Sequence, residues 1–144
     1  LEMKAAIAAA DGVLFVTPEY NRSIPAVLKN AIDWGTRPWG QNSWAEKPLA
    51  IAGASLGVIG TAAAQAHLRS IMVVLDAIVM GQPELYLAYK QGLINEQFDV
   101  TDDNVRQFLT KYVDRFAAWI VRRRTASRPC SSDAASSCDA RAAW

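Results

Sequence analysis

Short runs of apolar residues recur along the chain and are separated by polar segments and turn residues. The runs at residues 13–16 and 48–52 are each followed by Pro, Gly, Asn or Ser. A third run at residues 78–80 is broken soon after by Gly81 and Pro83. Continuous apolar runs of this length are typical of strands buried on both faces of a parallel sheet. We therefore predict three strands at these positions.

Between and around these runs, apolar residues recur at the spacing of an amphipathic helix. Residues 25–34 and 61–77 show it, and so does a segment that begins near Thr101. The alanine-rich residues 3–10 predict a further helix, which ends before Gly12. Strands that alternate with helices predict an α/β fold, with a parallel sheet between two layers of helices.

The last twenty residues differ in composition from the rest of the chain. Eleven of residues 125–144 are Ala or Ser, and apolar periodicity stops there. A segment of this kind buries too little apolar surface to offset the entropy of ordering. The sequence therefore predicts one domain over residues 1–124 and a disordered tail over residues 125–144.

Charge and cysteine content exclude several classes of protein. The net charge is only +1, so no basic face for nucleic acid is expected. No apolar run reaches the roughly 18 residues of a membrane span. The two cysteines, Cys130 and Cys138, both lie in the predicted tail. We therefore expect a cytoplasmic protein without structural disulfides, and the spacing of its Cys, His and carboxylate residues predicts no metal site.

Two loops that follow predicted strands are candidates for a ligand site. They cover residues 17–23 and 53–61. In an open parallel sheet, ligands bind beyond the carboxyl ends of the strands. Proline, asparagine and glycine after a strand also occur in ordinary turns. Spacing alone therefore leaves both interpretations open.

The sequence of the first loop and the segment after it is more specific. Residues 18–21 read Pro-Glu-Tyr-Asn, and residues 28–34 read Leu-Lys-Asn-Ala-Ile-Asp-Trp. This pattern closely resembles the NADPH-dependent FMN reductase family, above all the branch with quinone and chromate reductases. The resemblance continues through residues 53–61 and 65–69 and covers roughly residues 3–121.

The resemblance implies a flavodoxin-like, three-layer α/β/α fold with FMN as the cofactor. It implies two-electron transfer from NADPH or NADH, through FMN, to a quinone or a similar small-molecule acceptor, chromate included. It also implies a homodimer or homotetramer, with helices and the tryptophan-containing loop at the interface. The residues expected to border the isoalloxazine, largely through their backbone, are Pro18, Glu19, Tyr20, Asn21, Ser55 and Gly57.

For four further residues, the sequence supports less specific expectations. Arg37 could contact the phosphate of a nicotinamide cofactor, a carboxylate of a partner subunit, or only solvent. Trp34, Trp39 and Trp44 are expected in the core or at an interface, and one of them could cover the flavin.

The chain departs from the family pattern at its beginning. Members start with a strand and then a polar loop that holds the FMN phosphate at a helix N-terminus. This chain begins inside the helix that precedes the family's third strand. We therefore expect the first strands and the phosphate loop to be missing, and residues 13–16 to form an exposed sheet edge. An inactive reductase fragment is accordingly one alternative.

A second alternative comes from the sequence of residues 53–57. Gly-Ala-Ser-Leu-Gly matches the G-x-S-x-G nucleophile elbow of α/β-hydrolases. The only histidine, His67, lies twelve residues after Ser55, within the next predicted helix. In those hydrolases the acid follows the serine and the histidine comes last, in a late loop. The sequence therefore disfavours a serine hydrolase, and His67 is expected on a helix surface.

Overall fold

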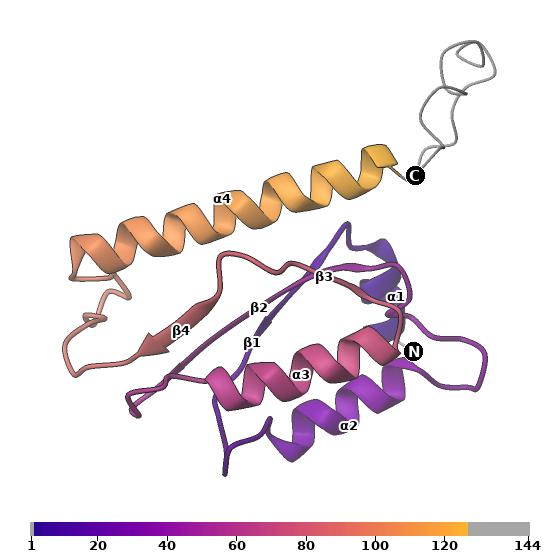
Figure 1. The fold of residues 1–144 in the computed structure, drawn as a ribbon, viewed down its shortest axis with the longest axis horizontal. Helices are drawn as coiled ribbons and strands as arrows, with labels where there is room; N and C mark the ends of the chain where they lie inside the picture. Colours follow the sequence, from indigo (N-terminus) through magenta and orange to yellow (C-terminus); the bar gives the residue numbers. More distant parts are fainter. Residues whose placement is uncertain (1, 127–144) are drawn as a thin grey trace, which may run out of the picture.

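A computed structural model describes residues 2–126, which form a four-stranded parallel sheet flanked by helices (Figure 1). Strand β2 is central, with β1 on one edge and both β3 and β4 on the other. The predicted α/β fold with a parallel sheet is confirmed. In chain order the elements are α1 (Glu2–Ala9), β1 (Val13–Val16), α2 (Ala26–Gly35), β2 (Pro48–Ser55), α3 (Ala62–Val74), β3 (Ile78–Val79), β4 (Leu85–Ala88) and α4 (Asp103–Ala126).

Alternating side chains of β2 divide the core between two layers of helices. Leu49 and Ile51 belong to the cluster built with α1, α2 and α3. Ala50 and Ala52 belong to the cluster built with α4. Figure 1 shows α4 on one side of the sheet, and α2 and α3 on the other. The expected three-layer α/β/α arrangement is therefore confirmed.

Strand β1 differs from the prediction that it is buried on both faces. Phe15 is 9% exposed, but Leu14 is 39% and Val16 is 72% exposed. Leu14 and Val16 border a hollow of about 210 Å³ that also includes Leu109 and Val113 of α4. The helix packs over β2 and β4 and leaves this face of β1 open. Within residues 2–126, no strand pairs with the outer edge of β1.

Strand β2 is three residues longer than predicted. Ala52–Ser55 pair in parallel with Leu85–Ala88 of β4, which extends β2 to Ser55. The predicted loop at residues 53–61 therefore begins at Leu56. The break at Gly81 and Pro83 is present, and after it the chain pairs with β2 again as β4. The prediction of three strands missed this fourth one, Leu85–Ala88.

The helices follow the prediction closely, with local differences. In α2, the apolar side chain of Val27 is 79% exposed. Helix α4 includes Thr125 and Ala126, so it extends two residues into the predicted tail. The rest of that tail, with both cysteines, lies outside the described residues. None of the helices in residues 2–126 is long and apolar enough to cross a membrane.

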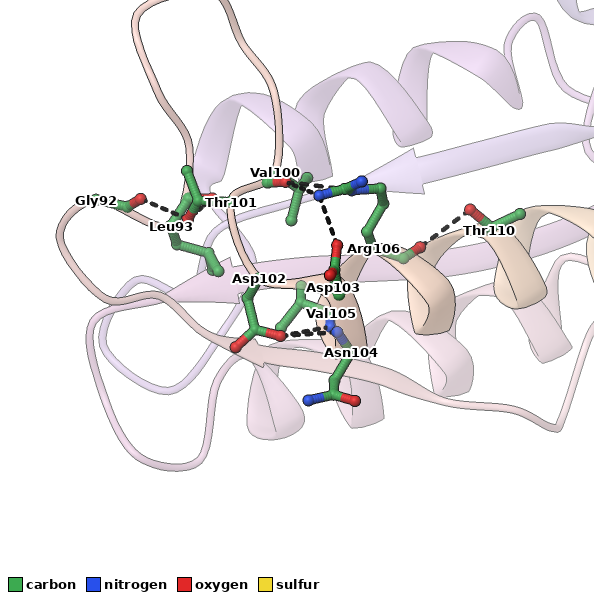
Figure 2. A network of polar contacts seen from close by, with 10 residues as sticks. All are labelled: Gly92, Leu93, Val100, Thr101, Asp102, Asp103, Asn104, Val105, Arg106 and Thr110. Atoms are coloured by element: carbon green, nitrogen blue, oxygen red, sulfur yellow. Dashed lines mark hydrogen bonds and ion pairs between the residues drawn. The ribbon is translucent and has the colours of Figure 1, made fainter.

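The start of α4 is fixed by a network of polar contacts (Figure 2). The Asp102 carboxylate accepts hydrogen bonds from the backbone N–H groups of Asn104 and Val105, at 2.8 and 3.1 Å. Arg106 donates to the Val100 carbonyl at 3.1 Å. Asp102 is therefore an N-cap of the common kind, which satisfies helix donors that have no intrahelical partner.

Candidate functional site

The loops that follow β1 and β2 both leave the sheet at the carboxyl ends of its parallel strands. Val16 lies opposite Ala52, and both strands run in the same direction. We call residues 17–23 the first loop and residues 56–61 the second loop. The structure thus places six predicted site residues at or just beyond the carboxyl ends of these two strands: Pro18, Glu19, Tyr20, Asn21, Ser55 and Gly57.

The first loop contains a tight turn held by backbone hydrogen bonds. The N–H of Tyr20 donates to the Ser23 carbonyl and the N–H of Ser23 to the Tyr20 carbonyl, each at 2.9 Å. Asn21 and Arg22 between them have φ angles of 50° and 68°. Positive φ at both central residues is the pattern of a type I′ turn, in which asparagine is favoured. The turn leaves Tyr20 61% exposed.

The second loop is folded around the hydroxyl of Ser55. This hydroxyl accepts from the Gly57 N–H at 3.2 Å and donates to the Gly60 carbonyl. Gly60 has a φ of +59°, and a Cβ there would lie 2.8 Å from the carbonyl carbon of Tyr86. Only glycine fits so close to β4 with that backbone angle. Both loops therefore have a defined shape within this chain.

Gly57 differs from the structurally constrained Gly60, because it faces open space. A Cβ at Gly57 would meet only the Ser55 hydroxyl oxygen, at 3.6 Å. Its neighbours Leu56 and Val58 are 84% and 95% exposed. Apolar side chains this exposed on a loop at a sheet edge are typical of a binding surface. The residues present fit a flat aromatic ring, which needs apolar contact and a close approach to backbone.

The side chain of Glu19 points into the protein. It is 8% exposed and lies 3.5 Å from the guanidinium of Arg22. Its carboxylate accepts a hydrogen bond of 3.0 Å from the backbone N–H of Ala64, in the first turn of α3. This contact was not predicted from the sequence. No local signal predicts it, because the two residues are 45 positions apart.

One side chain near the loops, that of Tyr86, has a shifted pKa. The backbone of Tyr86 lies against Gly60. Partial burial raises the pKa of Tyr86, and the hydrogen bond and negative charge of Glu84 raise it further. The phenol is therefore neutral at physiological pH. Within residues 2–126, no cluster of three His, Cys, Asp or Glu residues could hold a metal ion.

Arg37 lies away from the other predicted site residues. Helix α2 starts after the first loop and runs away from it, and Arg37 follows the end of that helix. The neighbouring Asn42 donates to the carbonyl of Leu75, at the far end of α3, at 2.8 Å. Arg37 itself lies over the ring of Trp39, at 5.7 Å from its centroid. In one copy of the chain, α2 therefore separates Arg37 from the first loop.

The three tryptophans near Arg37 have different environments. Trp44 is 3% exposed, whereas Trp34 is 64% and Trp39 is 89% exposed. The indole N–H of Trp44 donates to the Ile32 carbonyl at 2.9 Å. Trp44 is thus the core residue among the three, and Trp34 and Trp39 are available for an interface.

The geometry does not favour a serine hydrolase. The Ser55 hydroxyl is bonded to backbone groups of the second loop. The imidazole of His67 instead has its Nδ1 atom 3.1 Å from the Ser23 hydroxyl oxygen. A catalytic serine needs a base within hydrogen-bond reach, and the described contacts of Ser55 provide none.

Comparisons with known proteins relate the chain to one family of reductases. Residues 1–92 match the sequence model of the NADPH-dependent FMN reductase family. A 2-hydroxy-1,4-benzoquinone reductase from Burkholderia sp is 50% identical over 121 residues, which are 84% of this chain and 66% of that protein. An NAD(P)H-dependent FMN reductase from Pseudomonas aeruginosa is 43% identical over 118 residues, which are 82% of this chain and 63% of that protein.

A solved structure extends the similarity to three dimensions. The flavoenzyme NAD(P)H:(acceptor) oxidoreductase FerB from Paracoccus denitrificans aligns with a TM-score of 0.81 and 45% identity, covering 85% of this chain and 67% of FerB. The chain thus spans about two thirds or less of the curated relatives' own length, 66% and 63% in the two cases above.

Proposed function

Because the chain belongs to the NADPH-dependent FMN reductase family, we propose that it acts as an NAD(P)H-dependent FMN oxidoreductase. The proposed reaction reduces quinones or similar acceptors, chromate included, by two-electron transfer in the cytoplasm. The observation that carries the proposal is the pair of defined loops at the carboxyl edge of the sheet. The relatives named as quinone and FMN reductases support it.

Residues of the two loops have separate parts in the proposed activity. Backbone groups of Pro18 to Asn21 would orient one edge of the flavin, and the fixed φ of Pro18 limits the freedom of that loop. The second loop would approach the ring at Gly57, and the apolar Leu56 and Val58 would exclude water. When bound, FMN supplies the redox chemistry, accepting hydride from NAD(P)H and reducing the acceptor.

Flavin content and turnover of the purified protein test this proposal. We expect an absorbance band near 450 nm, a general property of oxidised flavins, and oxidation of NAD(P)H that depends on added quinone. Absence of both would favour the inactive-fragment alternative. Serine-dependent hydrolysis of an activated ester without flavin binding would favour the hydrolase alternative.

We also propose that the protein is a homodimer or homotetramer. Val27 and Trp34 lie seven residues apart on α2 and are 79% and 64% exposed. Val73 and Val74, at the end of α3, are 68% and 79% exposed. Residues seven apart lie on one face of a helix. An apolar surface of this kind is more typical of an interface than of solvent.

Trp34→Ala is expected to weaken self-association at least tenfold. Truncating a buried interface tryptophan commonly costs about 2 kcal/mol or more, and 1.4 kcal/mol is about tenfold in affinity. Sedimentation over a range of protein concentrations measures the change. An unchanged dissociation constant would mean that α2 does not form the interface.

Arg37→Ala is expected to raise the KM for NADPH and to leave the FMN content unchanged. Arg37 borders a cavity of about 470 Å³ together with Trp39 and Asn42. A guanidinium at this position could bind a phosphate group of the cofactor. Steady-state kinetics with NADPH and NADH measure the effect. An equal KM in the variant and the parent would leave Arg37 as a surface residue or a contact between subunits.

A further inference from the structure

The N-terminus of α3 lacks a cap from its own residues. Thr61 precedes the helix, and threonine at this position commonly accepts from the backbone N–H two or three residues later. Here its side chain makes no such bond. The Thr61 hydroxyl oxygen instead accepts from the Gln65 amide at 2.9 Å. The Ala62 N–H donates to the Ile59 carbonyl at 3.2 Å, whereas the Ala64 N–H needs a partner from outside the helix and its preceding loop.

Glu19 supplies that partner from the first loop. Its carboxylate accepts from the Ala64 N–H at 3.0 Å, and only 8% of its side chain is exposed. A carboxylate at a helix N-terminus is favoured by the helix dipole and forms a charge-assisted hydrogen bond. The cationic group beside it is Arg22, at 3.5 Å and 72% exposed. The contact is therefore mainly one between the first loop and α3.

This contact connects the two loops that border the proposed flavin site. Glu19 belongs to the first loop, and Ala64 lies three residues after the end of the second. We propose that Glu19 is a positioning residue of the flavin site, which fixes the spacing of the two loops by capping α3. This inference rests on the proposed function. A site held in its binding geometry loses less conformational entropy when the ligand binds.

Three variants separate positioning from general stability. Glu19→Ala removes the cap, whereas Glu19→Gln keeps an oxygen that can accept from Ala64. Asp102→Ala removes the cap of α4, shown in Figure 2, which belongs to neither loop. The measurements are the FMN dissociation constant, by quenching of flavin fluorescence, and the urea midpoint of the free protein.

We expect Glu19→Ala to weaken FMN binding by about tenfold or more, the equivalent of one lost charge-assisted hydrogen bond. Glu19→Gln should restore most of the affinity. Asp102→Ala should lower the urea midpoint and leave FMN affinity unchanged. Equal FMN affinity in Glu19→Ala and the parent would overturn the inference, and so would equal losses in Glu19→Ala and Asp102→Ala.

Amide hydrogen exchange tests the coupling of the loops without FMN. In Glu19→Ala we expect faster exchange both in residues 17–23 and at the start of α3, and in Glu19→Gln a smaller change. Faster exchange in α3 alone would show that the cap does not hold the first loop. If the parent protein binds no FMN, the proposed function fails, and the exchange result still decides whether Glu19 couples the loops.

Discussion

Gly57→Val is expected to abolish FMN binding without unfolding the protein. The proposed flavin ring approaches the second loop at Gly57, where a branched side chain would occupy the ring's place. In the free protein the added Cβ would meet only the Ser55 hydroxyl oxygen, at 3.6 Å, which is an ordinary contact. The substitution therefore affects the binding surface more than the fold. FMN fluorescence quenching and the urea midpoint measure the two effects separately.

Ser55→Ala is the matched comparison, at the last residue of β2 directly before the second loop. It removes hydrogen bonds to Gly57 and Gly60, and a neutral hydrogen bond contributes about 0.5–1.5 kcal/mol. We expect a loss of FMN affinity of roughly tenfold or less. Tight FMN binding by Gly57→Val would show that the ring does not lie against the second loop. A hydrolase would show the reverse order, with ester turnover lost in Ser55→Ala.

The order of strands and helices, apart from β4, could be predicted because its signals are local. The apolar run at β1 and the first residues of β2 identify two strands. Pro25 precedes α2, and Asp102 caps α4, so these two helices start where the local sequence indicates a helix start. Each of these signals lies within a few residues of the element that it predicts. The sequence alone therefore contains it.

The extent and burial of the strands could not be predicted in the same way. Gly53, Ala54 and Ser55 have composition typical of a turn, and they form strand because β4 pairs with them. Val16 is as apolar as a buried strand residue and is 72% exposed, because α4 does not cover it. Both outcomes depend on segments distant in the sequence.

The candidate site was predictable as a pair of loops but not in the directions of its side chains. The resemblance placed Glu19 next to the flavin largely through its backbone, and it did not indicate that the Glu19 carboxylate lies against α3. For Arg37 the sequence left a cofactor phosphate, a partner carboxylate and solvent open, and the structure places it after the end of α2, away from the first loop. A motif identifies which residues gather at a sheet edge. The backbone path decides which way each of them points.

Trp44→Ala is expected to destabilise the protein by about 3–5 kcal/mol, the usual cost of removing a buried tryptophan. The indole is 3% exposed, and its ring centroid lies 5.6 Å from that of Phe15 in β1. A Cβ at Gly35 would lie 2.8 Å from the Trp44 ring carbon Cζ2, so the ring fills the space against α2. The variant would leave a cavity there and remove the donor to the Ile32 carbonyl. Urea unfolding followed by circular dichroism measures the loss.

Trp39→Ala is the control for this prediction, because it removes the same type of side chain from the same segment, which joins α2 to β2. Trp39 is 89% exposed, and exposed substitutions usually change stability by less than about 0.5 kcal/mol. A large loss for Trp44→Ala with none for Trp39→Ala would show that Trp44 joins the segment before β2 to the core. Similar small losses of stability in both variants would mean that this segment packs loosely. The packing of Trp44 would then not fix the position of Arg37 at the end of α2.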